Sequence, residues 1–292
     1  MKPLPALELV TRFEDAEWLD PLAKSVRKVV LKVIKPRWAR DVLHGVPIGH
    51  PVHPLAVQVP IGAWVSAGVL DAVPGGEKAA RLLIGVGAAT VIPSALAGFT
   101  DWSQLHPQQQ RVGLVHAAAN VTATGLYVAS LVRRATGGVG SGKVLAYLGL
   151  ATVGAGGFLG GHLSYRQAAG VNHSEEIPHR FPAGWHPLAP LAELPEGGLH
   201  KRDVAGIPLL VHREGGTVNV LSDVCSHLSG PLHEGKIKDD GGDPCVVCPW
   251  HRSTFSLRTG EVRSGPATSR QPLFETRVTG DLVEVCLPGA DG

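Results

Sequence analysis

The chain has 292 residues, which is long enough for two domains. Lysine and arginine nearly balance aspartate and glutamate, 27 against 25, so nucleic acid is not an expected partner. Charged residues make up only 18% of the chain and the mean hydropathy is +0.11, a composition that argues against an ordinary water-soluble enzyme. All 4 cysteines fall in the last third, without the dense spacing of a secreted disulfide scaffold, so metal ligation explains them better.

Four apolar segments follow one another in the first part of the chain. Each is free of lysine, arginine and glutamate over most of its length, and each can cross a bilayer at about 1.5 Å of rise per residue. The segments are residues 55–73, 80–99, 112–132 and 144–165. Short polar turns separate them, so the sequence predicts an all-α, up-down bundle of transmembrane helices over residues 55–170. A water-soluble bundle with apolar core helices is the alternative, but such helices are hard to cover in a chain of this size.

The leading segment, residues 1–54, contains a stretch in which basic side chains are interleaved with valine and isoleucine. The basic residues are Lys24, Arg27, Lys28, Lys32, Lys35, Arg37 and Arg40. This pattern predicts a basic amphipathic helix on an anionic lipid surface, and a plain solvated helix is the alternative.

An even number of spans places both ends of the chain on one face of the membrane. The N-terminal sequence lacks the basic, apolar and small-residue regions of a leader, so we expect no export signal. Basic residues close to the spans are divided almost evenly between the two faces. The missing leader therefore decides the expected topology, a multi-pass protein of the cell membrane with both termini and the C-terminal domain on the cytoplasmic face.

After a linker at residues 171–186, short apolar runs alternate with glycine, aspartate and proline over residues 187–288. This pattern predicts a small all-β domain, so the expected fold is multidomain, with a helical bundle first and a β domain second. The β domain carries two motifs, Cys225-x-His227 and Cys248-x-x-His251. Two thiolates with two neutral imidazoles suit a two-iron cluster, and they also suit tetrahedral zinc, for which Cys245 with Cys248 would be a competing pair. Spacing alone leaves iron and zinc open.

The surroundings of these motifs resemble the Rieske iron–sulfur family. The resemblance rests on C-S-H-L-S-G-P-L at 225–232, C-P-W-H-R-S-T-F-S-L-R-T-G-E-V at 248–262 and S-G-P-A at 264–267, in this order. It implies one 2Fe-2S cluster. By the same resemblance, Cys225 and Cys248 would bind the buried iron, and His227 and His251 would bind the outer iron, through which electrons leave.

Two features distinguish this chain within that family. Quinol-oxidising respiratory members carry an extra cysteine in each ligand loop, whereas Ser229 or Gly230, and Trp250, stand there in this chain. The resemblance therefore implies the ferredoxin or oxygenase type. The ligand pairs are also separated by a few extra residues, D-D-G-G-D-P at 239–244, which we expect to form a surface turn.

The membrane half resembles a family of predicted four-span membrane proteins of uncharacterised function. This resemblance rests on G-H-P-V-H-P-L-A-V-Q-V-P-I-G at 49–62, D-W at 101–102 and G-G-H-L-S-Y-R at 160–166, and it implies topology only. The histidines add a functional hypothesis. His116 and His162 are placed about one turn inside the hydrocarbon boundary, where an imidazole is costly unless it has a partner.

We therefore expect His116 and His162, with His53 and His50 nearby, to form a site for a b-type haem or a quinone. Threading the helices up and down gathers these histidines at the membrane face that carries the β domain. The alternative is that His116 and His162 are structural and form hydrogen bonds within the bundle.

Together these observations predict a membrane-anchored electron-transfer protein that exchanges single electrons with a membrane redox centre or a partner protein. The alternative is a redox-sensing or docking subunit without its own membrane cofactor. We find no second histidine–carboxylate iron site and no G-x-G-x-x-G after a strand, so we expect an oxidoreductase component without catalytic residues of its own. The expected partners are the lipid bilayer, a redox protein or quinone, and a second copy of the chain.

Overall fold

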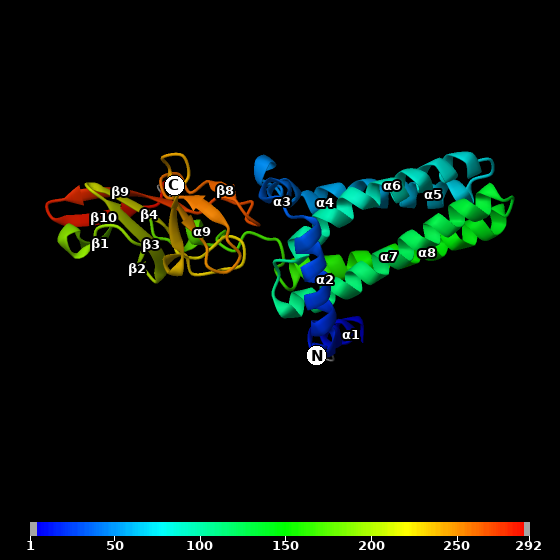
Figure 1. The fold of residues 1–292 in the computed structure, drawn as a ribbon, viewed down its shortest axis with the longest axis horizontal. Helices are drawn as coiled ribbons and strands as arrows, with labels where there is room; N and C mark the ends of the chain where they lie inside the picture. The colour runs from blue at the N-terminus through cyan, green and yellow to red at the C-terminus, as the bar shows by residue number, and fades with distance from the viewer. Residues whose placement is uncertain (1–4, 289–292) are drawn as a thin grey trace. The chain divides into compact units, whose positions relative to one another are not determined.

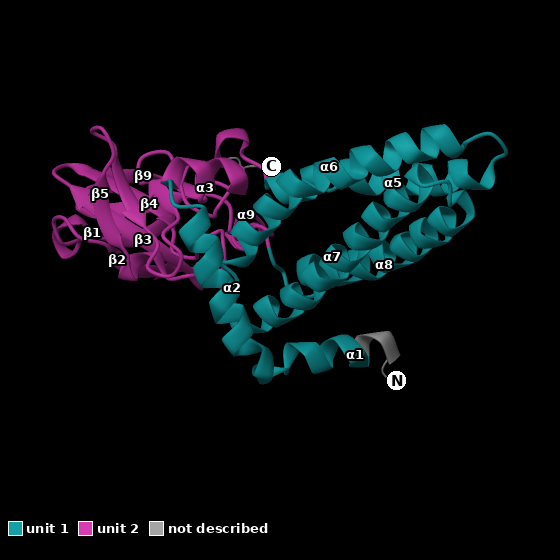
Figure 2. Cartoon of the chain, turned by 45° about the vertical axis from the view of Figure 1, so that its right-hand side comes forward, with its two compact units in different colours: residues 1–36, 51–169 teal, residues 37–50, 170–292 magenta. Residues whose placement is uncertain are grey.

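The structure, a computed structural model, describes residues 5–288. It divides into two compact units, and the division does not follow the chain in a single cut (Figure 2). The first unit ends at Pro36 and resumes with Pro51–Ala169, and the second combines Arg37–His50 with the chain from Gly170 onward. A short piece of the leading segment thus packs with the C-terminal unit.

The first unit is built around four long helices (Figure 1). They are Val52–Ala72, formed by α4 (Val52–Ala56) and α5 (Gln58–Ala72), then α6 (Glu77–Trp102), α7 (Pro107–Ala135) and α8 (Val139–Tyr165). Each is long and apolar enough to cross a membrane. Helix α5 packs on α6 and α7 packs on α8, which confirms the predicted apolar bundle.

The helix ends and the helix packing follow from local chemistry. Helix α7 starts at Pro107, whose fixed φ suits a first helical position, and Gln109 accepts a hydrogen bond from the backbone N–H of His106 at 2.9 Å. Between α5 and α6, a side chain at Gly87 would begin 2.2 Å from the Trp64 indole nitrogen, so glycine is required there. The same indole stacks on Tyr127 with ring centroids 4.2 Å apart, which joins α5 to α7.

The leading segment is broken by Pro36, so the basic residues do not share one helix. Helices α1 (Pro5–Glu14) and α2 (Asp20–Val33) belong to the first unit, and α3 (Arg37–His44) belongs to the second. The carboxylate of Asp20 binds the Arg111 guanidinium through two hydrogen bonds of 2.7 and 2.9 Å, which ties α2 to α7. That ion pair also lowers the pKa of Asp20.

The second unit contains two antiparallel sheets. The strands of the larger sheet run in the order β1-β10-β9-β4-β3-β2, and those of the smaller sheet in the order β5-β6-β7-β8. The bounds are β1 His186–Pro190, β2 His200–Val204, β3 Ile207–Glu214, β4 Thr217–Ser222, β5 Lys236–Asp239, β6 Pro244–Val247, β7 Thr254–Ser256, β8 Val262–Ser264, β9 Leu273–Thr279 and β10 Leu282–Cys286. Leu210 and Leu221 of the larger sheet share a buried cluster with Phe255 of the smaller one. This β-rich unit confirms the predicted fold class.

A buried ion pair joins α5 to α7 inside the bundle. The guanidinium of Arg134 donates to both oxygens of the Asp71 carboxylate, and the two side chains are 2% and 0% exposed. Ser130 lies beside the pair and accepts from Arg134 Nε at 3.1 Å. Each charge is therefore compensated where water cannot reach it.

Removing one partner of this pair should destabilise the bundle strongly. Asp71→Asn leaves the Arg134 guanidinium buried without a counter-charge, which costs on the order of 3–5 kcal/mol, so thermal unfolding of the full chain in detergent should show a lower Tm. Replacing both, as Asp71→Leu with Arg134→Met, should recover much of the loss. The matched control is Glu77→Gln, which breaks the more exposed pair with Lys143 and should cost about 0–1 kcal/mol. Equal Tm values for Asp71→Asn and Glu77→Gln would contradict this account.

Candidate metal centre

The first predicted ligand pair lies in a tight loop that follows β4. The Cys225 N–H donates to the Gly230 carbonyl at 3.0 Å, and the Ser229 N–H donates to the Cys225 carbonyl at 2.9 Å. Ser229 adopts a φ of +60°, which closes the loop. At its far end, the buried Asp223 carboxylate accepts the His233 backbone N–H and contacts the His233 ring, both at 2.7 Å. Cys225 itself is 1% exposed.

The second pair lies in a loop of the same design, between β6 and β7. The Cys248 N–H donates to the Ser253 carbonyl at 2.8 Å, and the Arg252 N–H donates to the Cys248 carbonyl at 3.2 Å. Arg252 takes the positive φ of +66°, as Ser229 does in the first loop. Two similar loops, one from each side of a shared core, thus present a cysteine followed by a histidine.

The structure brings the four predicted ligands together as two pairs. The sulfurs of Cys225 and Cys248 form a hydrogen bond, which raises the pKa of Cys225 and lowers that of Cys248. The rings of His227 and His251 lie 5.1 Å apart at an interplanar angle of 83°. Within residues 5–288, no group of three or more His, Cys, Asp or Glu side chains converges on a single point suited to one ion.

Backbone amides are directed at both sulfurs. The N–H groups of His227 and Leu228 donate to Cys225, and those of Trp250 and His251 donate to Cys248, and each of these bonds lowers the pKa of the cysteine that receives it. Burial acts in the opposite direction and raises both pKa values. The backbone N–H groups therefore favour negative charge at each sulfur, while the contact with Cys248 and burial keep the net pKa of Cys225 above its ordinary value.

A third loop covers the second ligand loop. The Ala267 N–H donates to the Ser253 hydroxyl at 3.1 Å. Gly265 has a φ of +98°, and a side chain there would begin 2.7 Å from the Ser253 Cα atom. Sequence reasoning found this loop through S-G-P-A, and the tight contact explains why glycine stands in it.

Residues from outside the β sheets also reach these loops, and sequence reasoning missed them. Arg37 of α3 donates to the hydroxyls of Thr254 and Ser264, and Asp41 accepts the Gly265 N–H at 2.9 Å. His173, in the predicted linker, donates its backbone N–H to the Ser226 carbonyl at 2.9 Å. Contacts across so many residues leave no periodic signal in the sequence.

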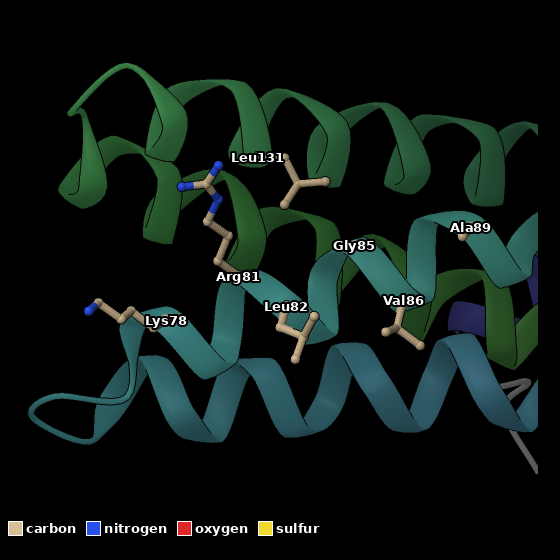
Figure 3. Close-up of a pocket in the computed structure, with 7 residues that line it drawn as sticks. All are labelled: Lys78, Arg81, Leu82, Gly85, Val86, Ala89 and Leu131. Atoms are coloured by element: carbon tan, nitrogen blue, oxygen red, sulfur yellow. The ribbon is translucent and has the colours of Figure 1, made fainter.

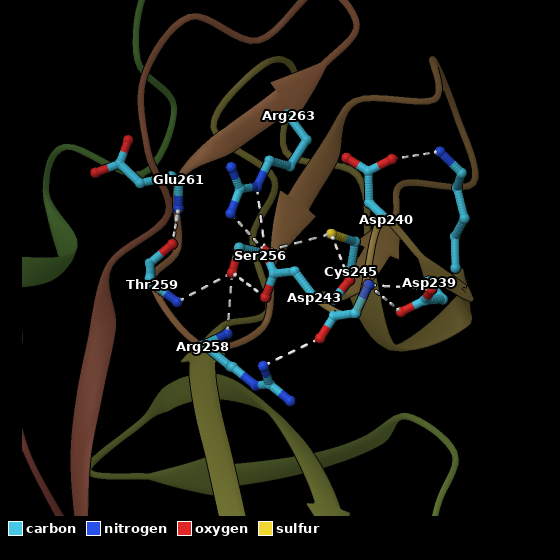
Figure 4. A network of polar contacts seen from close by, with 11 residues as sticks. Asp239, Asp240, Asp243, Cys245, Ser256, Arg258, Thr259, Glu261 and Arg263 are labelled. Atoms are coloured by element: carbon cyan, nitrogen blue, oxygen red, sulfur yellow. Dashed lines mark hydrogen bonds and ion pairs between the residues drawn. The ribbon is translucent and has the colours of Figure 1, made fainter.

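The extra residues between the ligand pairs form an ordered turn (Figure 4). Asp243 accepts from the Arg263 guanidinium at 2.6 Å and from the Ser256 hydroxyl at 3.1 Å. Burial raises the pKa of Asp243, but these two bonds together with the positive charges of Arg263 and Arg258 hold the pKa below its ordinary value. Cys245 lies beside this network and is buried, which raises its pKa, so it is not poised as a thiolate.

The histidines of the first unit have separate partners. His116 Nδ1 lies 2.8 Å from the Gly156 carbonyl, His53 Nδ1 lies 2.9 Å from the Ser94 carbonyl, and these two rings are 6.4 Å apart. His162 Nε2 lies 2.5 Å from a carboxylate oxygen of Glu14 in α1. Among the four predicted residues, His53 and His116 lie near each other in the first unit, and His50 belongs to the second unit.

A shallow groove of about 610 Å³ also lies on the bundle surface along α6 (Figure 3). Its lining residues are Lys78, Arg81, Leu82, Gly85, Val86, Ala89 and Leu131. None of the four predicted histidines is among them, so this groove does not serve as the predicted haem or quinone site.

Alanine in place of Gly265 should destabilise the second unit. Alanine at φ +98° costs about 1–2 kcal/mol, and its Cβ must also displace the Ser253 backbone, so thermal unfolding of the full chain should begin at a lower temperature. The matched control is Gly241→Ala, because Gly241 has a φ of +69° with nothing within 4 Å of an added Cβ. A Tm for Gly265→Ala equal to that of Gly241→Ala would refute the close approach.

Comparisons with known proteins match both halves of the chain. A model of the Rieske 2Fe-2S domain matches residues 184–277, and a model of the predicted membrane protein family DUF2231 matches residues 49–173. The anthranilate 1,2-dioxygenase ferredoxin subunit of Burkholderia cepacia is 33% identical over 103 residues, which are 35% of this chain and 92% of that protein. The 3-phenylpropionate/cinnamic acid dioxygenase ferredoxin subunit of Escherichia coli (strain K12) is 32% identical over 101 residues, again 35% and 92% of the two chains.

Similarity extends to a human protein and to solved structures. A Rieske domain-containing protein of Homo sapiens is 41% identical over 63 residues, 22% of this chain and 37% of its own length. The ferredoxin of carbazole 1,9a-dioxygenase from Nocardioides aromaticivorans IC177 is 28% identical with a TM-score of 0.32, and the match covers 34% of this chain and 94% of that chain. A Rieske domain implies a 2Fe-2S cluster. Through residues 184–277 the chain therefore belongs to the Rieske family, and this domain follows one that matches the predicted membrane protein family DUF2231.

Proposed function

We propose that the protein is a membrane-anchored electron carrier that holds one 2Fe-2S cluster through Cys225, His227, Cys248 and His251. The observation that carries the proposal is the meeting of these side chains as a thiol pair and an imidazole pair. A cluster of this type binds two protein ligands on each iron, whereas tetrahedral zinc requires all four around one ion. The separate pairs therefore favour the cluster over zinc.

The residues around the pairs fit such a group. When bound, a 2Fe-2S cluster accepts and releases one electron at a time. The backbone N–H groups that donate to the two sulfurs stabilise thiolate charge, which favours ligation and raises the reduction potential. The neutral imidazoles of His227 and His251 lower the negative charge further than two more thiolates would. His251 is less buried than Cys225 and Cys248, so the imidazole side is the proposed route for electrons.

The helical half supports the membrane anchor. Its four helices have the length and composition of spans, and an even number returns the chain to the face where it began. We propose that this face is the cytoplasmic one, where a basic helix meets anionic lipid. The basic α2 would then lie near the anionic leaflet.

Partners follow from the comparisons at the level of chemical class. Two relatives are named as ferredoxin subunits of dioxygenases, so we propose a redox protein as the exchange partner of this chain, with a quinone as the membrane-soluble candidate. A b-type haem on His116 and His162 stays a prediction without support. The His116 ring lies at the Gly156 carbonyl, and the His162 ring lies at the Glu14 carboxylate. Self-association of the chain also stays a prediction.

A redox-sensing or docking subunit is the second candidate function. It would use the same cluster but pass no electron onward within the membrane. Reoxidation of the reduced cluster in the purified full chain distinguishes the two candidates: rapid oxidation by an added redox protein or a short-chain quinone supports the carrier, and a cluster that passes electrons to neither favours the sensor.

Metal analysis of single cysteine variants tests the ligand set. The wild-type protein should carry two irons and two acid-labile sulfides per chain. Cys225→Ser should lose the iron and the sulfide together, because one thiolate cannot hold the buried iron alone. The matched control is Cys245→Ser, which changes another buried cysteine outside the ligand loops and should keep both irons.

Two results would overturn the assignment. A colourless wild-type preparation with one zinc per chain would replace the cluster by a zinc site. Loss of iron in Cys245→Ser together with its retention in Cys225→Ser would show that the sulfur ligands were chosen wrongly.

A further inference from the structure

We propose that α3 is a two-sided adaptor, which binds the Rieske domain with one face and lies in the lipid–water interface with the other. This proposal rests on the proposed membrane anchor and adds a specific surface to it. The adaptor would hold the cluster-binding loops at a fixed orientation to the membrane, rather than at the end of a loose tether.

The bound face of α3 consists of Arg37, Asp41 and His44. These residues are spaced four and three apart, so they lie on one side of the helix. Arg37 donates to Ser264 and, at 3.1 Å, to Thr254, two residues that face each other across the β7–β8 ladder. Asp41 accepts the Gly265 N–H at 2.9 Å, and His44 is only 3% exposed. The helix is thus fastened to the loop that covers the second ligand pair.

The opposite side of α3 is apolar and open. Trp38 is 71% exposed and Val42 is 49% exposed, one helical turn apart, and Ala39 and Leu43 lie on the same side with partial exposure. Leaving a tryptophan and a valine in water is unfavourable by roughly 25 cal/mol per Å² of apolar surface. A partner that removes this surface from water would stabilise the protein.

Three features identify the lipid–water interface as that partner. The first span begins at Val52, and residues 45–51, which connect it to α3, reach at most about 25 Å when fully extended. Tryptophan is enriched at this depth, because its ring is apolar and its N–H can still meet water. Arg40 lies beside the apolar side of α3 and suits the phosphates of an anionic leaflet.

The orientation of the cluster in ordered membranes provides the test. The full chain would be reconstituted in phosphatidylcholine–phosphatidylglycerol vesicles, dried into oriented multilayers, and reduced for electron paramagnetic resonance. The amplitude of the cluster signal should vary with the angle between the multilayer and the magnetic field. The double variant Trp38→Ser with Val42→Ser should lose this angular variation with an unchanged spin count, because its Rieske contacts stay intact.

Two further variants sharpen the test. Asp41→Ala should also lose the angular variation, since it releases the other face of the helix. The matched control is Ile237→Ser, which removes an apolar side chain with 41% exposure from β5 and should leave the angular variation unchanged. Ile237 is exposed on the same domain but has no place in the adaptor.

Each other outcome refutes the proposal in a recognisable way. Undiminished angular variation in the Trp38→Ser, Val42→Ser variant means that this face does not anchor the domain. Conversion of a dimer to a monomer by the same variant, measured by light scattering, means that a second copy covers the face instead. A wild-type chain without cluster signal, or one released from vesicles by alkaline carbonate, overturns the proposed function itself rather than the adaptor alone.

Discussion

The second unit depends on the close approach of two buried cysteine sulfurs, which the proposed cluster would bind as thiolates. Cys225 and Cys248 are 1% and 2% exposed, a position in which a thiolate is unstable unless something compensates its charge. The compensation is local: each cysteine opens a tight loop whose next N–H groups turn back to the sulfur. To make this turn, Ser229 and Arg252 adopt a positive φ, a backbone conformation that is unfavourable for residues other than glycine.

This constraint explains the arrangement of the sheets around the loops. The first loop follows β4 of the larger sheet and the second follows β6 of the smaller sheet, so the sulfurs meet only because the sheets share a core. Leu210, Leu221 and Phe255 fill that core and are fully buried. Packing in the core and the distance between the thiols are therefore coupled. A substitution that disturbs the core packing should also change the distance between the two sulfurs.

The sequence predicted local features well and distant polar contacts poorly. Helix lengths came from composition, and the ligand pairs came from motifs confined to a few residues. The Asp71–Arg134 pair was not predicted, because its two residues lie in different segments and the Arg134 side chain reaches from α7 to α5. Asp41 was missed for a related reason, since its partner is the backbone of Gly265, far along the chain. Polar contacts between distant segments follow no hydrophobic period, and only the folded chain reveals them.

Pro36 divides the leading segment between the two units. Its first part is fastened to the helical bundle, where Asp20 binds Arg111, Glu14 meets His162, and Arg27 donates to the Ser103 carbonyl at 2.6 Å. Pro36 cannot continue α2, and the chain restarts as α3 with Arg37 and Asp41 directed at the β domain. A continuous helix would have kept all the basic side chains with the bundle. Because of the break, each unit contains its own part of the leading segment. The polypeptide therefore connects the two units through the leading segment as well as through the linker that precedes the β domain.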